Sequence, residues 1–348
     1  MGQIGPVVED PPEVGRRCGG LMGETKMMVT RRSALALAAM SGMAIHTRPA
    51  FAADKLRVGK SIGSSFPFSG ADLAKTKGFF AAVGIDAEIS VFRGDGQMQQ
   101  AMAAGVLDVG FGSGPGMGYA AKGVPAIAVA AMASEPRNMS LVVMKDGPIK
   151  TVDDLKGKRI GVTTAGSLTD WLTRRLAESK GWGPTGIDVT AMGEMRTRLA
   201  AMKSGELAGS VNSIQETWNL VENGEGRLLA TFGDAVPDFH THVIFAHRNL
   251  IKNNPDLLKR FLKAWFTTTK FMKENREETV KLIAATMSLP VSVVDKSYDY
   301  EMQMLSMDGA FNPKAIETIR KSLKDLEILD RIPDANELFL PGYAPVKL

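Results

Sequence analysis

From Leu56 onward, the sequence alternates short apolar runs with amphipathic segments, and this alternation constrains the fold more than any other feature. Short apolar runs are typical of buried strands, and amphipathic segments with a 3.6-residue period are typical of helices. Strands that alternate with helices form βαβ units, so the sequence predicts the α/β class with doubly wound, largely parallel sheets. The first strands are expected at residues 56–59, 85–92, 106–111 and 126–131, with helices at 71–83 and 97–104.

The same rhythm starts again at Leu141, which predicts a second sheet. Its strands are expected at residues 141–144, 159–162, 187–191, 207–211 and 227–231, with helices at 167–179, 194–203 and 213–221. A strand at 241–246 is expected to return to the first sheet. The helices after it are expected at 255–273, 276–286, 291–304 and 313–326, two of them starting at an Asn-Pro pair, in which Asn caps the helix and Pro fits its first position.

The length of 348 residues exceeds one average domain, and two lobes of ordinary size are expected. We expect residues 54–138 and 241–348 to form lobe 1, and residues 139–240 to form lobe 2. No low-complexity linker separates the lobes, so the chain is expected to cross between them twice, near 134–140 and near 239–246. A paired crossing favours closure about a hinge over independent domains.

Residues 1–53 differ from the rest of the chain and are interpreted as a leader with an export signal. Arg31-Arg32 supply the positive charge, residues 34–40 begin an apolar stretch, and Ala50-Phe51-Ala52 give a small-x-small cleavage pattern. The apolar stretch has about a dozen residues, fewer than the roughly 20 that cross a bilayer as a helix. A periplasmic location is therefore expected, and the sequence leaves open the general and the twin-arginine export routes.

The leader also bounds the start and the thiol chemistry of the mature chain. Acidic residues and prolines before Met27 and Met28 make a poor signal, so we expect translation to begin at one of these methionines and the mature chain to begin at Ala53 or Asp54. Cys18 is the only cysteine, and it precedes these positions, which excludes a disulfide or a thiolate nucleophile from the mature chain. The net charge of +4 falls by two without the leader, which argues against a nucleic-acid partner.

Small and hydroxyl-bearing residues follow the predicted strands of both lobes. In doubly wound sheets, ligands bind beyond the carboxyl ends of the strands, where loops lead into helix N-termini with free N–H groups. These loops supply the candidate ligand-binding residues, which are Ser64, Ser65, Phe66, Asp95, Ser113, Gly114, Thr164, Gly166, Ser167 and Asn212.

Several of these candidates have a second interpretation. Gly166 and Ser167 are the expected place for the charged end of an anion, because a helix N-terminus offers oriented donors, but they are also ordinary capping residues. Phe66 either contacts an apolar part of the ligand or packs into the core. Asp95 either holds a cationic group or caps a helix, and Asn212 is expected to face the cleft from lobe 2.

His240, His242 and His247 suggest a metal site, because imidazoles two residues apart on a strand point the same way. No third ligand stands at a suitable spacing, so we expect neither a metal ion nor a cofactor.

Several short segments, in a consistent order, resemble one family. They are residues 77–80, 84–88, 101–110 and 123–125 in lobe 1, and 151–162 followed by 166–167 in lobe 2. Over about residues 56–271, the chain resembles the substrate-binding proteins of ABC importers for sulfonates, taurine, nitrate and thiamine-pyrimidine compounds, a family named after yeast thiamine-pyrimidine synthase. The chain departs from the family at Gly209-Ser210, where relatives often carry an acidic residue, so we expect the hinge-side wall of the cleft to differ.

The resemblance implies a type II fold like that of periplasmic binding proteins. It also implies an extracytoplasmic solute-binding protein, without enzymatic activity, that captures a small polar or anionic solute between its lobes. The implied partners are the solute and the membrane permease of an ABC importer, and a monomer is expected. Two alternatives stay open: a pyrimidine-synthase-like enzyme on the same fold, and a binding protein that serves a sensor or another carrier. The solute itself stays open among sulfonates, nitrate, aromatic acids, pyrimidines and amides.

Overall fold

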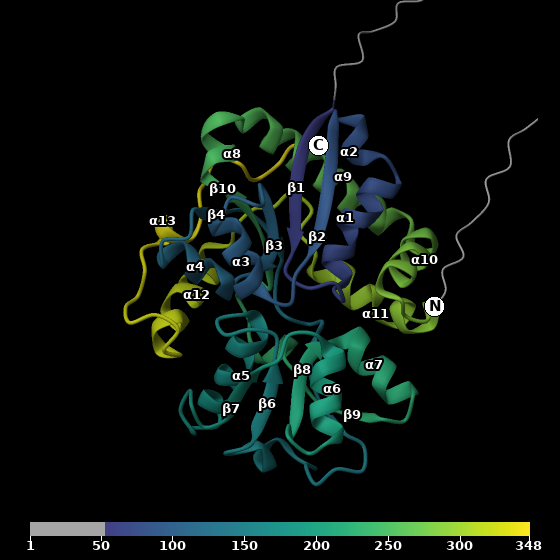
Figure 1. The fold of residues 1–348 in the computed structure, drawn as a ribbon, viewed down its shortest axis with the longest axis vertical. Helices are drawn as coiled ribbons and strands as arrows, with labels where there is room; N and C mark the ends of the chain where they lie inside the picture. Colours follow the sequence, from purple (N-terminus) through teal and green to yellow (C-terminus); the bar gives the residue numbers. More distant parts are fainter. Residues whose placement is uncertain (1–52) are drawn as a thin grey trace, which may run out of the picture. The chain divides into compact units, whose positions relative to one another are not determined.

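The computed structural model describes residues 53–348, whose strands form two mixed sheets of five strands each (Figure 1). The first sheet has the order β2-β1-β3-β10-β4, and the second has the order β7-β6-β8-β5-β9. We call the first sheet with its helices lobe 1 and the second sheet with its helices lobe 2. The predicted α/β fold with two lobes is confirmed. The predictions made for the export signal, the start at Met27 or Met28 and Cys18 lie outside the described residues.

Lobe 1 is built from the two ends of the described chain. Its strands are β1 (Asp54–Lys60), β2 (Ile85–Val91), β3 (Val109–Ser113), β4 (Ala126–Ala133) and β10 (His242–His247). Its earlier helices are α1 (Phe66–Thr76), α2 (Phe79–Ala82), α3 (Asp95–Ala103), η1 (Pro115–Met117) and α4 (Gly118–Ala121). Its later helices are α8 (Arg248–Asn253), α9 (Pro255–Glu274), α10 (Arg276–Met287), α11 (Val291–Met304), α12 (Pro313–Asp325) and α13 (Ala335–Leu338).

Lobe 2 is built from the middle of the chain. Its strands are β5 (Met139–Met144), β6 (Arg159–Val162), β7 (Asp188–Ala191), β8 (Gly209–Ser213) and β9 (Gly226–Thr231). Its helices are η2 (Val152–Leu155), α5 (Leu168–Ser179), α6 (Met195–Lys203), α7 (Ile214–Glu222) and η3 (Gly233–Ala235). The chain passes between the two sheets at 134–138 and at 232–241. Closure of the two lobes about these crossings stays a prediction.

Each sheet contains one strand that arrives from the other lobe, and this strand runs antiparallel. β10 is antiparallel to β3 and β4, and β5 is antiparallel to β8 and β9. The other pairs, such as β1 with β2 and β6 with β7, are parallel. Two parallel strands that follow each other in the chain need a crossover connection, usually a helix. β5 and β10 each follow a crossing from the other lobe, so this requirement does not apply to them.

Both faces of the lobe 1 sheet are buried at β3, β10 and β4, where successive side chains, which point to opposite faces, are all buried. In β10, Ile244 packs with α1, α2 and α9 on one face, whereas Val243 and Phe245 pack on the other face with Met98 of α3. Figure 1 shows α1, α2 and α9 on one side of this sheet and α3 and α4 on the other. The second core continues into lobe 2 through Trp171. Strand ends are thereby held at fixed positions facing lobe 2.

The start of the first helix differs from its prediction. The sequence predicts a helix over 71–83, but α1 begins at Phe66, next to Pro67, and ends at Thr76. A new short helix, α2, follows Gly78, whose φ of 75° lies in the left-handed region that favours glycine. The early start matters for the site because it places Phe66 inside a helix and not in a loop. No helix among residues 53–348 is both long and apolar enough to cross a membrane.

Candidate ligand-binding site

A small cavity lies where the loops of both lobes meet. Its volume is about 60 Å³, which is room for about two water molecules or one compact solute group. Lobe 1 lines it with Ser61, Ile62, Ser64, Ser65, Phe68, Gly94, Asp95, Ser113 and His242. The crossing and lobe 2 line it with Asn138, Met139, Thr163, Leu168, Thr169, Arg198, Val211, Asn212, Ser213 and Glu216. The cavity lies at the strand ends, as expected for doubly wound sheets.

Five of the ten candidate residues line this cavity, and they come from four separate loops. They are Ser64, Ser65, Asp95, Ser113 and Asn212. Ser65 is the N-cap of α1, but its hydroxyl caps no N–H group and has no hydrogen-bond partner in the described structure. Asn212 is the residue before the last of β8, and its side chain is tied to Ser210 through both Oδ1 and Nδ2. These positions stay candidates for contact with a ligand.

Asp95 lines the cavity, and its carboxylate is bonded mainly to Ser113 of lobe 1. Its Oδ1 accepts from the backbone N–H of Ser113 at 3.0 Å, and its Oδ2 accepts from the Ser113 hydroxyl at 2.7 Å. Burial raises the pKa of Asp95, and the hydrogen bonds from Ser113 oppose this shift. Asp95 is the first residue of α3, and Gly94 is the N-cap of this helix. The carboxylate of Asp95 therefore ties the start of α3 to the end of β3.

Phe66 lies away from the cavity, which favours packing over ligand contact. It is fully buried in the core of lobe 1 and meets Tyr298 edge to face, with ring centroids 6.2 Å apart. The aromatic residue that lines the cavity is Phe68, two residues further along α1. The physical reason is the early helix start, because the helix turns Phe66 and Phe68 to different sides.

Gly114 and Thr164 also lie outside the cavity lining, and each fills a contact between chain segments. A Cβ atom at Gly114 would collide with the carbonyl oxygen of His240, so glycine allows this loop to approach the second crossing. Thr164 of lobe 2 accepts a hydrogen bond from the backbone N–H of Gly96 in lobe 1 at 3.0 Å. Both residues therefore join segments and do not face the enclosed space.

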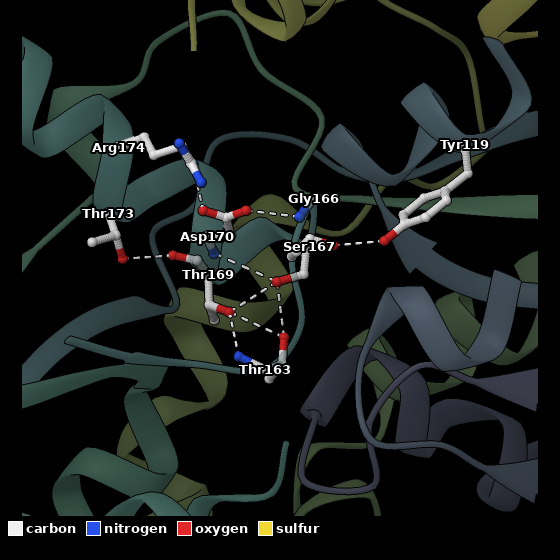
Figure 2. A network of polar contacts seen from close by, with 9 residues as sticks. Tyr119, Thr163, Gly166, Ser167, Thr169, Asp170, Thr173 and Arg174 are labelled. Atoms are coloured by element: carbon white, nitrogen blue, oxygen red, sulfur yellow. Dashed lines mark hydrogen bonds and ion pairs between the residues drawn. The ribbon is translucent and has the colours of Figure 1, made fainter. Parts of the chain in front are cut away.

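The expected anion site at Gly166 and Ser167 is occupied by the carboxylate of Asp170, which belongs to α5. The backbone N–H of Gly166 donates to Oδ2 of Asp170 at 2.7 Å, and Arg174 donates to Oδ1 of Asp170 at 2.6 Å (Figure 2). The Ser167 hydroxyl accepts from the N–H of Asp170 at 3.5 Å and joins the hydroxyls of Thr163 and Thr169. These residues cap α5, and Asp170 takes the place that an anion would need.

Fourteen of the residues that line the cavity were not among the candidates, and five of these carry aromatic, amide or ionisable side chains: Phe68, Asn138, Arg198, Glu216 and His242. Phe68, Arg198 and Glu216 lie within helices, and Asn138 lies in the crossing between the lobes. Their signal in the sequence is weak, because a polar residue inside an amphipathic helix is usually solvated. Glu216 was near the expected strand end after Val211, and this position is the one clue that the sequence offered.

Arg198 is a buried cation without a carboxylate partner among the described residues. Its side chain is fully buried on α6. Its Nη1 atom donates to Ser210 Oγ at 2.9 Å and to the carbonyl oxygen of Val211 at 2.6 Å, but its Nε atom has no partner. Burial lowers the pKa of Arg198, and the charge of Glu216 opposes that shift. Gly209, where the family often carries an acid, packs against β5 and cannot supply the missing partner.

Glu216 joins the two lobes at the cavity wall. Its Oε1 atom accepts a 2.5 Å hydrogen bond from the hydroxyl of Ser64, which lies in lobe 1. Burial raises the pKa of Glu216, while Arg198 and the Ser64 hydroxyl lower it. Glu216 therefore loses its proton at a higher pH than an exposed glutamate does.

His242 brings an unpaired imidazole to the cavity. Neither of its ring nitrogens has a hydrogen-bond partner within residues 53–348, and its ring meets Phe68 edge to face with centroids 4.7 Å apart. Burial lowers the pKa of His242 to about 3, so the ring is neutral at physiological pH. A neutral imidazole offers one donor and one acceptor, and neither is paired with a described residue.

The three histidines considered as metal ligands have separate environments. His240 accepts from the backbone N–H of Asn312, and His247 accepts from the N–H of Asn249 at the start of α8. Within residues 53–348, no group of three or more His, Cys, Asp or Glu residues is arranged to hold a metal ion.

Four side chains around the cavity have buried polar atoms that lack any hydrogen-bond partner. The atoms are Ser65 Oγ, Asn138 Oδ1, Arg198 Nε and both ring nitrogens of His242. An unpaired buried polar atom costs about 1–3 kcal/mol. These four residues come from both lobes and line one cavity, so a small polar molecule held there would lie next to them.

Further hydrogen bonds join the lobes around the cavity. Tyr119 of lobe 1 donates to the carbonyl oxygen of Ala165 in lobe 2 at 2.6 Å (Figure 2). The indole N–H of Trp171 on α5 donates to Ser322 on α12 at 2.7 Å, and this bond is buried. Together with the pair of Ser64 and Glu216, these bonds hold the walls of the cavity against each other.

Comparison with known proteins identifies the family. Residues 66–286 match the family described as NMT1/THI5 like. A protein of Brucella abortus (strain 2308), named as a binding protein, is 28% identical over 251 residues, which are 69% of this chain and 76% of that protein. The 4-amino-5-hydroxymethyl-2-methylpyrimidine phosphate synthase of Schizosaccharomyces pombe is 26% identical over 225 residues, 60% of this chain and 63% of that enzyme.

The fold has solved counterparts. The structure of the alkanesulfonate-binding protein SsuA from Xanthomonas axonopodis pv. citri, bound to MOPS, superimposes with a TM-score of 0.69 at 18% identity and covers 81% of this chain and 95% of that one. This likeness confirms the type II fold of periplasmic binding proteins that the sequence predicted. The family match extends over more than half of the chain and agrees with the motifs found in the sequence. This chain belongs to the NMT1/THI5-like family.

Proposed function

We propose that this protein binds one small polar solute in the cavity between its lobes and delivers it to an ABC importer. The observation that carries the proposal is that residues from both lobes with unpaired buried polar atoms line this cavity. A solute that pairs these atoms removes a cost of about 1–3 kcal/mol for each of them. Binding therefore stabilises the arrangement in which the two walls face each other.

The solute carries an anionic or strongly accepting group, and this group faces Arg198. A buried guanidinium without a carboxylate partner is costly, and a ligand anion supplies the missing charge. Planar guanidinium groups bind the oxygens of acidic groups through paired hydrogen bonds. The alkanesulfonate named for the Xanthomonas relative is one compound of this kind. Ser65 and His242 supply further contacts for the rest of the solute.

The mechanism is closure of the lobes on the solute. A ligand shifts a conformational equilibrium only as far as it binds one state better than the other. Here the closed state alone brings Arg198 and Asn138 together with Ser65 and His242 around one space. The permease of the importer then receives the closed, loaded form.

The experiment that tests this function is a thermal-shift screen of the mature chain, followed by calorimetry. The panel contains alkanesulfonates, nitrate, aromatic acids, pyrimidines and amides. We expect an acidic compound to raise the melting temperature of the wild-type chain, because a bound ligand stabilises the folded state by mass action. Arg198→Met is the matched variant and should lose this response. No stabilisation by any class in the panel would contradict the proposal.

Scattering and localisation test the remaining steps. With a ligand from the screen, small-angle X-ray scattering should show a smaller radius of gyration, and an unchanged radius would argue against closure. N-terminal sequencing of protein from a periplasmic fraction should begin at Ala53 or Asp54. Uptake of the ligand by cells should require this protein together with the permease.

Binding without turnover distinguishes this proposal from the enzymatic alternative. The relative in Schizosaccharomyces pombe is named as a synthase, but the only cysteine of this chain is Cys18, which precedes the expected mature start. We expect mass spectrometry to recover the bound solute unchanged after prolonged incubation with the protein. A modified solute would favour the enzyme.

A further inference from the structure

Glu301 of α11 lies fully buried beside the cavity wall and bonds to two side-chain amides. Its Oε1 atom accepts from Asn138 Nδ2 at 3.1 Å and from Gln215 Nε2 at 2.5 Å. Its Oε2 atom accepts from Asn138 Nδ2 at 2.9 Å. Asn138 belongs to the first crossing, and Gln215 belongs to α7 of lobe 2. One carboxyl group of lobe 1 therefore meets the hinge and the other lobe.

The chemistry of a carboxylate decides how these amides are turned. An ionised carboxylate only accepts hydrogen bonds, so each amide presents its NH₂ group to Glu301. The carbonyl oxygens then point elsewhere, and Asn138 Oδ1 and Gln215 Oε1 have no partner in the described structure. Asn138 lines the ligand cavity, whereas Gln215 is not among the residues that line it.

We propose that Glu301 is a positioning residue that fixes the side-chain amide of Asn138 with its carbonyl oxygen facing the cavity. Asn138 then acts as an acceptor, and the part of the solute that meets it is a hydrogen-bond donor. The statement about the solute rests on the proposed function. The orientation of Asn138 is independent of that function, because Glu301 sets it in the ligand-free chain.

Protonation of Glu301 reverses the hydrogen-bonding requirement that it places on the two amides. A protonated carboxyl has one O–H donor, which needs an acceptor, and a turned amide of Asn138 or Gln215 supplies it. Burial raises the pKa of Glu301 to about 7, although the hydrogen bonds from Gln215 and Asn138 oppose the shift. The group that Asn138 shows to the cavity therefore depends on pH around neutrality.

No described charged residue is bonded to Glu301, so the two amides dominate its surroundings. Charged groups do occur on the elements packed around it, and each is engaged or directed elsewhere. On α7, Glu216 bonds to Ser64 at the cavity and Glu222 pairs with Lys296 of α11. On α10, Arg276 pairs with Asp295 and Asp299 on an exposed side of α11. In the crossing, Arg137 precedes Asn138.

Nuclear magnetic resonance of the ligand-free full chain tests this inference. Asparagine labelled with ¹⁵N gives the side-chain NH₂ signals of Asn138, followed from about pH 5.5 to about pH 8.5. In the wild-type chain, both proton shifts of Asn138 should titrate with a midpoint near the pKa of Glu301. In Glu301→Gln, which keeps the shape but does not titrate, this titration should vanish. Glu222→Gln removes an exposed pair between α7 and α11 and should leave it intact.

A second variant keeps the test decisive if Glu301→Gln folds poorly. Gln215→Met removes one donor that stabilises the ionised carboxylate, so the midpoint seen at Asn138 should move to higher pH. A wild-type Asn138 signal that does not change with pH, or that titrates equally in Glu301→Gln, would overturn the inference. So would an unchanged midpoint in Gln215→Met. None of these readouts uses a ligand, so a failed ligand screen would count against the proposed function alone.

Discussion

The hydroxyl of Ser64 in lobe 1 donates a 2.5 Å hydrogen bond to the carboxyl of Glu216 in lobe 2. This bond crosses the mouth of the cavity and joins two residues that are 152 positions apart in the sequence. Ser64 precedes α1 of lobe 1, and Glu216 lies in α7 of lobe 2. The bond therefore exists only while the two walls of the cavity face each other, which makes it a direct reporter of closure.

Removing this bond should open the lobes. A hydrogen bond of this kind contributes about 1–2 kcal/mol, so Ser64→Ala should lower the ratio of closed to open chains roughly fivefold or more. The radius of gyration from small-angle scattering should be larger than that of the wild type at the same ligand concentration. Ser213→Ala is the matched control, because the Ser213 hydroxyl reaches the Ser64 carbonyl oxygen only at 3.4 Å. Identical radii for all three chains would exclude this role.

Arg198→Met should separate ligand binding from stability. Removing one partner of a buried charge pair costs about 2–4 kcal/mol, so the affinity for an acidic solute should fall roughly thirty- to thousand-fold. The ligand-free chain should lose less than about 1 kcal/mol of unfolding free energy or gain some, because an unpaired buried charge is removed. Calorimetry and denaturant unfolding measure the two quantities. Equal affinities in variant and wild type would remove Arg198 from the site.

Asp170→Asn should weaken the fold and leave the ligand affinity unchanged. The carboxylate of Asp170 binds the N–H of Gly166 and the side chain of Arg174, so its loss should cost about 1–3 kcal/mol of unfolding free energy. If the start of α5 held the solute anion, removing a negative charge there would raise the affinity instead. Titration calorimetry with an acidic ligand distinguishes these results. A clear gain in affinity would restore Gly166 and Ser167 as the anion site.

His242 should make the fold sensitive to acid. Burial lowers the pKa of His242 to about 3, below its ordinary value, so the unfolded chain binds a proton more readily than the folded chain. Its contribution to stability is therefore present above about pH 6.5 and is lost as the pH falls towards 3, at about 1.4 kcal/mol per pH unit. His242→Gln should flatten the dependence of unfolding free energy on pH in this window. Parallel curves for variant and wild type would show that the imidazole is not buried in its neutral form.

The positions of the helices and strands were largely predictable from the sequence, because they depend on local periodicity. The four long C-terminal helices begin and end within about one residue of their predicted bounds, two of them behind Asn-Pro caps. The α1 helix was less predictable, because Pro67 permits a helix start that the apolar pattern does not mark. The direction of β5 and β10 was also missed, since it depends on which lobe the chain comes from.

The sequence by itself determined the class of fold, the family and the loops that surround the site, because these follow from periodicity, capping residues and motif order. Only the tertiary structure decided which side chains face the cavity. It turned Phe66 into the core of lobe 1 and Phe68 towards the cavity, paired the N–H of Gly166 with Asp170, and buried Arg198 without a carboxylate partner among the described residues. The physical reason is that burial and hydrogen-bond partners come from residues far apart in the chain, and a local pattern does not contain them.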